Sequence, residues 1–227
     1  MYSIRPNLVI GFHGCDEETC QSLLNHPNEL IYSEKPYDWL GHGLYFWENN
    51  YERALLWAKD KNTRGEIKTP SVIGAVLYLG YCLDLLDSNY IKILQEYYKV
   101  MEAEYRILNK EIPQNKDLIL DKHKDKIIRE LDCTLIEYMH QAILEQITEE
   151  KKTQGFSDLK IFDSARGVFT EGGPAFPGAG IQEKNHIQIC IRNSNAIKGF
   201  FLPRKEMDFT PESILKDQKK RLKTGNN

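Results

Sequence analysis

The periodicity of the sequence changes twice, and this restricts the possible folds more than any other feature. Short apolar segments typical of buried strands occur up to about residue 85 and return after Gly155. Between them, a helical pattern covers about 126–148, and an earlier apolar stripe has the three- and four-residue spacing of one helix face: Ile91, Leu94, Tyr98, Met101, Tyr105 and Leu108. We therefore predict an α+β fold in which a helical hairpin is inserted at about residues 88–155.

Local signals predict the other elements. Residues 187–191 alternate isoleucine with Gln188 and Cys190, which predicts a strand with one buried face. Gly14 is expected to break the first strand, and Asp16 is expected to cap a short helix that runs through Leu24. The expected strands are 8–12, 44–47, 72–85, 168–170, 187–191 and 197–202, of which 72–85 is the longest, and a further short helix is expected at 51–58.

Composition excludes several classes of protein. The chain has 227 residues, of which 41% are apolar, so it can bury a core and is not a mostly disordered protein. No apolar run approaches the roughly 20 residues of a membrane helix, and the first residues do not have the pattern of a secretion signal. The five cysteines are scattered without a CxxC pair, which argues against a disulfide framework and a zinc site. We expect a cytoplasmic protein with no metal and no membrane partner.

Charge is distributed unevenly along the chain. The net charge is −3, but residues 216–227 carry five positive charges and one negative charge, so this tail is +4 and the rest is −7. A basic domain that wraps a nucleic-acid duplex is therefore not expected. We expect one domain over residues 1–215, followed by a basic tail that either steers a nucleic acid or is simply solvated.

Three segments combine residue types that are suited to a ligand site. Phe12-His13-Gly14 would place an imidazole at a strand end, where glycine allows a ligand to approach closely. The Gly41-x-Gly43-Leu44-Tyr45 segment would leave space beside a phenol ring on which a flat ligand can stack. The loop 171–180 leads to Glu183, whose carboxylate can stabilise a developing positive charge. Taken singly, the three segments also fit a satisfied histidine, an aromatic core strand and a solvated loop carboxylate.

In this order, the segments resemble the diphtheria-toxin-like and poly(ADP-ribose)-polymerase-like ADP-ribosyltransferases. Those enzymes have His-Gly on the first strand, Gly-x-Gly-(Ile/Leu)-Tyr-Phe on the next, and an acidic residue or Gln late in the chain. Phe12-His13-Gly14 and Gly41-His42-Gly43-Leu44-Tyr45-Phe46 match the first two blocks. The resemblance covers roughly 7–86 and 160–204 and leaves out the helical insertion. The whole chain also resembles a group of uncharacterised bacterial proteins, which brings no activity with it.

The resemblance implies a split β-sheet core that binds NAD as a co-substrate. It implies that His13 bonds the adenosine ribose, that Tyr45 stacks on the nicotinamide ring, and that the backbone at Gly14 contacts the nicotinamide amide. Gly43 would also line the NAD site. These roles are expectations that depend on the resemblance.

The chain departs from the family pattern at the third position. The family has its catalytic carboxylate at the start of the late strand, whereas here Gln188 is on that strand and Glu183 precedes it in the loop. Either Glu183 reaches the site from the loop, or Gln188 holds the position and carboxylate stabilisation of the transition state is lost. We favour Glu183 as the catalytic residue, with Gln188 lining the same pocket.

The expected function is that of an NAD-dependent mono-ADP-ribosyltransferase. It would act as an intracellular bacterial toxin or phage-defence effector on a macromolecular acceptor, either a nucleic acid or a protein, with an antitoxin protein as a possible partner. One alternative is an NAD glycohydrolase that uses the same pocket. Another is an inactive module that binds ADP-ribose or a protein. The absence of GxGxxG and Walker-type loops argues against other common nucleotide folds.

Overall fold

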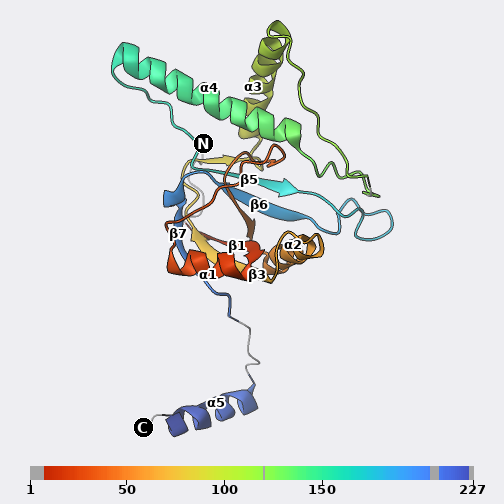
Figure 1. Ribbon diagram of the computed structural model, residues 1–227, viewed down its shortest axis with the longest axis vertical. Coiled ribbons are helices and arrows are strands. Elements are labelled where there is room, and N and C mark those ends of the chain that lie inside the picture. Colours follow the sequence, from red (N-terminus) through yellow and green to blue (C-terminus); the bar gives the residue numbers. More distant parts are fainter. Residues whose placement is uncertain (1–7, 120, 205–209, 225–227) are drawn as a thin grey trace.

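The strands form one mixed seven-stranded sheet (Figure 1). The computed structural model describes residues 8–119, 121–204 and 210–224. Only β4 and β5 run parallel, and the other neighbouring strands are antiparallel. The sheet order is β4-β5-β6-β2-β1-β3-β7, formed by β1 (Val9–Asp16), β2 (Leu44–Glu48), β3 (Pro70–Leu77), β4 (Cys82–Asp84), β5 (Ser164–Phe169), β6 (His186–Ile191) and β7 (Ile197–Phe201). This mixed sheet with separate helices confirms the predicted α+β class.

The pairing between β1 and β2 is the shortest in this sheet. It consists of two residue pairs, Gly11 with Glu48 and Phe12 with Trp47. In contrast, β1 pairs with β3 through eight residue pairs, and β2 pairs with β6 through four. Beyond Phe12 and Trp47, β1 remains paired with β3 on its other side, and β2 remains paired with β6. The sheet therefore consists of two halves that are joined by a short seam at β1 and β2.

Helices α1 (Glu17–Asn25) and α2 (Tyr51–Thr63) cover opposite faces of the half that contains β1 and β3. Helix α1 begins after Asp16 as predicted, but the Asp16 carboxylate makes no capping hydrogen bond and instead accepts from the backbone nitrogen of Lys68 at 2.6 Å. The helix packs Cys20 and Leu23 against Cys15 and Ile73. Helix α2 extends five residues beyond the predicted 51–58 and packs Ala54 against Trp47 and Val72. Because successive strand residues point to opposite faces, Cys15 and Val72 belong to different sides of the sheet.

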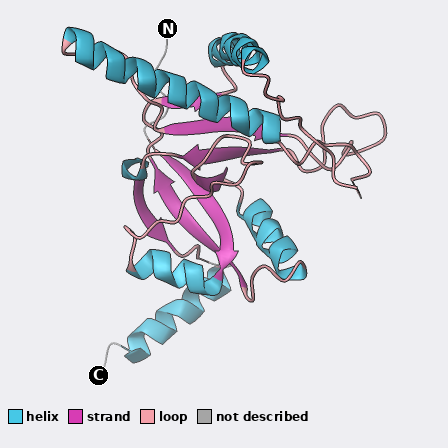
Figure 2. Ribbon diagram, turned by 45° about the horizontal axis from the view of Figure 1, so that its top comes forward, coloured by secondary structure: helices cyan, strands magenta, loops and turns pink. Residues whose placement is uncertain are grey.

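The insertion consists of α3 (Ser88–Ile107) and α4 (Glu130–Gln154), which agrees with the predicted range of 88–155. Helix α4 buries Ile136, Met139 and Ile143 in a core that also contains Ala165 and Cys190. In helix α3 only Met101 is buried, so most of the predicted apolar stripe remains partly exposed. The two helices cross each other and are joined by the long segment 108–129, so they do not form a tight hairpin (Figures 1 and 2).

Three sequence predictions about the strands were wrong. Gly14 does not break the first strand, because β1 continues through it to Asp16. The predicted long strand 72–85 is divided into β3 and β4, with Gly80 at a φ of 60° between them. This break sends β4 to the opposite edge of the sheet, beside β5. Strand β6 has buried residues on both faces, His186 and Cys190 on one and Ile189 and Ile191 on the other.

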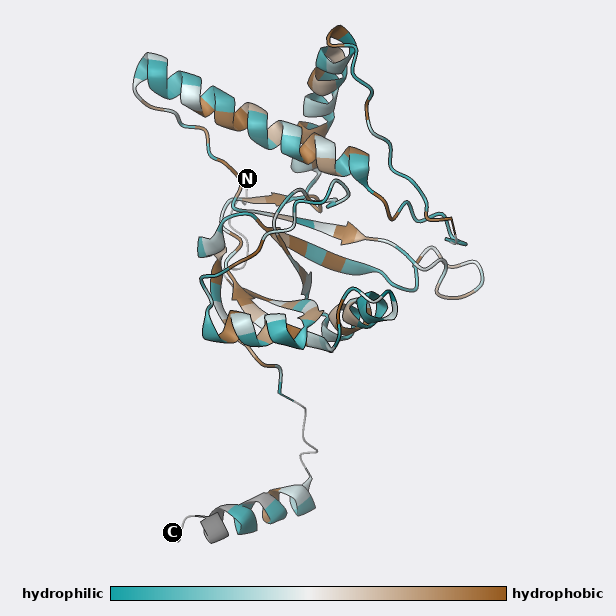
Figure 3. Ribbon diagram, viewed as in Figure 1, coloured by the Kyte–Doolittle hydropathy of each residue, from teal (hydrophilic) through white to brown (hydrophobic). Residues whose placement is uncertain are grey.

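The remaining features concern the surface and the end of the chain. Hydrophobic residues concentrate on the strands, and hydrophilic and hydrophobic residues alternate along α1 and α4 (Figure 3). Helix α5 (Pro211–Thr224) lies apart from the sheet in Figure 1, and the expected boundary between 215 and 216 falls inside it. Residues 225–227 of the expected tail lie outside the described residues. All five cysteines are buried.

Within the described ranges, none of the helices combines the length and the apolar character that crossing a bilayer requires.

Candidate functional site at the fork between two half-sheets

His13 lies at the point where β1 and β2 separate, one residue beyond the last pair of the seam. Its Nδ1 is 2.7 Å from the backbone oxygen of Tyr45. A carbonyl oxygen can only accept, so Nδ1 carries the proton and donates it. Burial lowers the pKa of His13, although the hydrogen bond to Tyr45 acts in the opposite direction. The imidazole is therefore neutral near pH 7, and its Nε2 is an acceptor suited to a hydroxyl group.

Tyr45 is held by the glycine loop that precedes it. Its hydroxyl donates to the backbone oxygen of Gly41 at 2.8 Å and accepts from the backbone nitrogen of Leu40 at 2.9 Å. Burial raises the pKa of Tyr45 well above the ordinary value of a phenol. The hydroxyl is thus fully used inside the protein, so a ligand could meet only the half-buried ring.

The side chains of His13 and Tyr45 belong to different faces of the sheet. Phe12 is the register partner of Trp47, and this places Trp47 and Tyr45 on the Phe12 face. His13 lies on the other face with Phe46, at a distance of 5.9 Å between ring centroids. The two predicted residues are joined through the Tyr45 backbone, while their rings do not share one pocket wall.

The loop before β2 is fastened by the inserted helix α4. The Glu137 carboxylate accepts from the backbone nitrogen of His42 at 2.7 Å and pairs with both terminal nitrogens of Arg192. Arg192 also donates to the backbone oxygen of His42 at 3.1 Å. Burial alone would favour the neutral acid, but hydrogen bonds and the Arg192 charge hold the pKa of Glu137 below its ordinary value. A Cβ at Gly41, where φ is 82°, would lie 2.5 Å from Glu137 Oε1 and 2.6 Å from Arg192 Nη1.

The two other glycines of the predicted site are packed against protein atoms. A Cβ built at Gly14 would lie 2.1 Å from the backbone oxygen of Ala54 in α2. A Cβ at Gly43 would lie 2.5 Å from the sulfur of Cys190 and from the backbone oxygen of Ile191. Close packing of the protein on itself therefore explains why both positions lack a side chain.

Gln188 lies on the same face of the sheet as Tyr45, because its register partner is Trp47. Its Oε1 accepts a hydrogen bond of 2.6 Å from the indole Nε1 of Trp39. Trp39 covers Gly167 on the neighbouring strand, where an added Cβ would lie 2.6 Å from the indole ring. Trp39 therefore contacts Gln188 on the same face of the sheet as the Tyr45 ring.

Glu183 lies outside the sheet on an arm formed by residues 171–185. Backbone hydrogen bonds join the two sides of this arm, from Glu183 to Gly173 at 2.8 Å and from Lys184 to Glu171 at 3.0 Å. Glu183 is exposed, and its carboxylate has no hydrogen bond or ion pair with any residue in the described ranges. The structure therefore brings Tyr45 and Gln188 to one face and His13 to the fork, and leaves Glu183 in solvent.

Sequence reasoning missed a polar cluster at the start of β6. The buried carboxylate of Glu171 pairs with Arg53 of α2, and the His186 ring lies 6.3 Å from the Trp47 ring. Trp47 Nε1, Arg53 Nε and His186 Nε2 are buried without a hydrogen-bond partner among the described residues. Burial lowers the pKa of His186 to about 4, and its Nδ1 donates to the backbone oxygen of Lys184 at 2.7 Å, so the buried Nε2 is an acceptor. No sequence signal pairs Arg53 with Glu171, because 118 residues separate them.

Two surface cavities lie near these residues, and neither is lined by His13, Tyr45, Gln188 or Glu183. One, of about 420 Å³, is bordered by Gln182 and by residues of the segment 115–129. The other, of about 480 Å³, lies between α4 and the segment 161–163. It is lined in part by Glu137 and Arg192, the two residues that hold the loop before β2. Within the described ranges, no group of three His, Cys, Asp or Glu side chains could hold a metal ion.

Comparison with known proteins shows one distant relative and leaves the family open. The chain is 24% identical over 202 residues to an uncharacterised protein of Methanocaldococcus jannaschii, and the match covers 82% of this chain and 83% of that protein. Residues outside 88–154 make up only 160 of 227 residues, or 70%, so the match extends into the inserted helices. No family model and no solved structure matches the chain.

Proposed function

We propose that the protein is an NAD-dependent mono-ADP-ribosyltransferase whose NAD site lies at the fork between β1 and β2. One observation carries this proposal: His13 follows the two-pair seam directly and is fixed by its hydrogen bond to the Tyr45 backbone. This bond leaves a neutral Nε2 as an acceptor for a ribose hydroxyl. The order of the His-Gly and Gly-x-Gly-Leu-Tyr-Phe segments in the sequence gives independent support.

The proposed chemistry requires positioning and charge stabilisation. The bond between nicotinamide N1 and ribose C1′ breaks, and its electron pair leaves with nicotinamide. An acceptor heteroatom then forms a bond to C1′ and loses its proton. A carboxylate close to C1′ would stabilise the positive charge that develops on the ribose, and His13 would orient the other ribose.

Glu183 is the better candidate for that carboxylate of the two on the arm. Glu171 is buried and paired with Arg53, so its charge is already neutralised. Glu183 has no such partner within the described ranges, and the arm that carries it leads directly into β6. The proposal requires the arm to bring Glu183 toward the fork when NAD binds.

The test is nicotinamide release from NAD, measured by mass spectrometry with the purified protein alone and with added RNA, DNA or protein extract. Glu183→Gln should lower release at least about 100-fold, as expected for the loss of transition-state charge stabilisation. Glu149→Gln is the matched control, because it makes the same change at an exposed position of α4. Wild-type rates in Glu183→Gln and in Tyr45→Ala would overturn the assignment.

The same experiment separates the reaction class. Release that needs one class of macromolecule, and that labels it, supports a transferase and identifies the acceptor. Release with free ADP-ribose as the product supports an NAD glycohydrolase. We also propose the intracellular role of a toxin or defence effector that is controlled by an antitoxin protein. Expression should then arrest growth, and His13→Ala should relieve the arrest; harmless expression of the wild type in several hosts would contradict this role.

A second candidate is a module that binds ADP-ribose or a protein without catalysis. The observation that favours it is the amide of Gln188 on the strand face, held by Trp39, where a carboxylate would be expected. Tight NAD binding without any nicotinamide release would support this alternative. In that case Gln188→Glu is the next variant to measure.

A further inference from the structure

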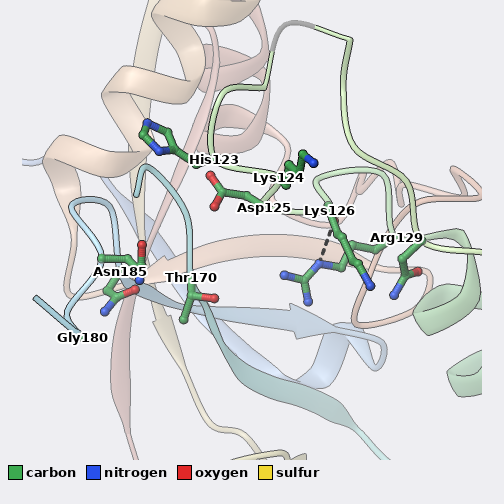
Figure 4. A pocket seen from close by; sticks show the side chains of 10 residues that line it. His123, Lys124, Asp125, Lys126, Arg129, Thr170, Gly180 and Asn185 are labelled. Atoms are coloured by element: carbon green, nitrogen blue, oxygen red, sulfur yellow. Dashed lines mark hydrogen bonds between the residues drawn. The ribbon is translucent and has the colours of Figure 1, made fainter. Parts of the chain in front are cut away.

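We infer that the cavity between the inserted segment 115–129 and the arm 171–185 binds a phosphate group. The cavity has a volume of about 420 Å³. Figure 4 shows His123, Lys124, Lys126 and Arg129 around it on one side and Thr170 and Asn185 on the other. The two sides come from parts of the chain about 50 residues apart, so the site exists only in the folded protein.

Specific contacts hold the two sides together. The Asp125 carboxylate accepts a hydrogen bond of 2.8 Å from the backbone nitrogen of Gly172. The His123 ring lies against Gly173, where an added Cβ would be 2.3 Å from Nδ1. Gly172 and Gly173 both have positive φ values, 92° and 73°, which glycine adopts without strain. These contacts join the base of the arm, at Gly172 and Gly173, to the inserted segment.

Two nearby carboxylates, Asp117 and Asp121, accept hydrogen bonds from backbone nitrogens and form no ion pair with Lys124 or Lys126. Asp121 accepts from the backbone nitrogens of His123 and Asp125, and Asp117 accepts from that of Lys126. These bonds accompany left-handed backbone at Lys124 and Lys126, with φ values of 57° and 49°. Lys124 and Lys126 line the cavity, and neither ammonium forms an ion pair with any residue in the described ranges.

Arg129 adds a third and more rigid cation. Its guanidinium lies 4.3 Å from the centre of the Phe169 ring, and its Nε donates to the backbone oxygen of Lys126 at 3.0 Å. Its Nη1 is 3.4 Å from the Asp132 carboxylate, a contact that offsets part of the charge. Three cations, Lys124, Lys126 and Arg129, and one carboxylate, Asp125, thus line the cavity. This charge pattern favours an oxyanion with several acceptor oxygens.

The cavity adjoins the residue proposed to act in catalysis. Gln182 lines it, and Glu183 is the next residue on the same arm. The inference that the cavity holds the phosphate of the acceptor, a nucleic acid, rests on the proposed function. Phosphate recognition itself does not, because the cations that line the cavity would attract any phosphate group. The same chemistry would bind the pyrophosphate of NAD, and the experiment separates these two sources.

The experiment measures binding by the full chain of a fluorescent 12-nucleotide single strand, by anisotropy, and of NAD, by calorimetry. Inorganic phosphate serves as a competitor in both. The test variant is Lys124→Gln/Lys126→Gln, which removes two charges from exposed positions. The control is Lys151→Gln/Lys152→Gln, which removes two exposed charges from the other end of α4.

We expect the test variant to bind the oligonucleotide at least about tenfold more weakly at 0.1 M salt. Its salt dependence should fall by about 1.4 in slope, since each phosphate contact to a single strand contributes about 0.7. The control should change neither value. If NAD binding alone weakens, the pocket holds the phosphate of the dinucleotide. Equal loss in the control variant, or no loss with either probe, overturns the inference. Nicotinamide release plays no part in these readouts, so this result stands or falls separately from the proposed activity.

Discussion

Replacing Gly14 by alanine tests whether helix α2 or a ligand requires glycine at this position. The added Cβ would lie 2.1 Å from the backbone oxygen of Ala54, which is 1.3 Å short of the 3.4 Å at which ordinary contact begins. The opposing atom belongs to the backbone of a 13-residue helix and cannot rotate away as a side chain would. The whole helix must move, or the strand must bend.

Overpacking of a well-packed core costs about 1–3 kcal/mol, and a clash with helix backbone belongs at the upper end. We therefore expect Gly14→Ala to lower the free energy of unfolding by about 3 kcal/mol. For a chain of this length, about 2–4 °C per kcal/mol gives a fall in Tm of about 6–12 °C. Urea unfolding followed by circular dichroism, together with calorimetry, measures both quantities.

Gly199→Ala is the matched control. Gly199 also lies in a strand, β7, but a Cβ there would meet no atom within 4 Å. Its stability should stay within about 0.5 kcal/mol of the wild type. If both variants unfold at the wild-type midpoint, α2 does not pack on β1 as described. If Gly14→Ala is stable but no longer binds NAD, the glycine is needed by the ligand and not by the helix.

Three further outcomes follow from buried polar groups. Trp39→Phe should cost about 1–2 kcal/mol, because Gln188 loses its donor; an unchanged urea midpoint would contradict this. Burial lowers the pKa of His140 and of His186 to about 4, below the unfolded value, so their contribution to stability is complete above about pH 6.5 and is lost toward pH 4. Protonation of each histidine should lower the free energy of unfolding by about 2 kcal/mol between pH 7 and pH 5. His140→Gln should remove the contribution of one histidine, measured by urea unfolding at the two pH values. Burial raises the pKa of Cys15 to about 12, so its thiol should react with a disulfide reagent only after unfolding; rapid reaction of the native protein would refute its burial.

The sequence predicted features that depend on local pattern. The helical spacing between residues 91 and 108 placed the insertion correctly, and Asp16 marked the start of α1. Strand breaks were less predictable, because a β-branched segment such as 72–85 has the same local character whether it is one strand or two. The change of direction at Gly80 depends on where β4 finds a partner, and that partner lies about 80 residues later.

The candidate site shows the same limit. Motifs identified His13 and Tyr45, and the structure places them on neighbouring strands, yet no motif indicates that their side chains belong to opposite faces. That difference depends on the register of two residue pairs. The ion pair between Arg53 and Glu171 and the clamp between Glu137 and Arg192 join distant parts of the chain. Pairings of this kind leave no trace in a single sequence.

The order of strands in the sheet has a consequence for synthesis on the ribosome. Strand β6 lies inside the sheet between β5 and β2, yet it is the next-to-last strand of the chain to be made. Until residue 191 has left the ribosome, β2 and β5 each present an unpaired edge, and β3 waits for β7. The nascent chain can form α3 and α4 but cannot close the sheet, so its exposed strand edges must be kept from other chains during translation. Truncation before His186 should therefore yield an aggregating product, because the last two strands complete the sheet that all the earlier ones need.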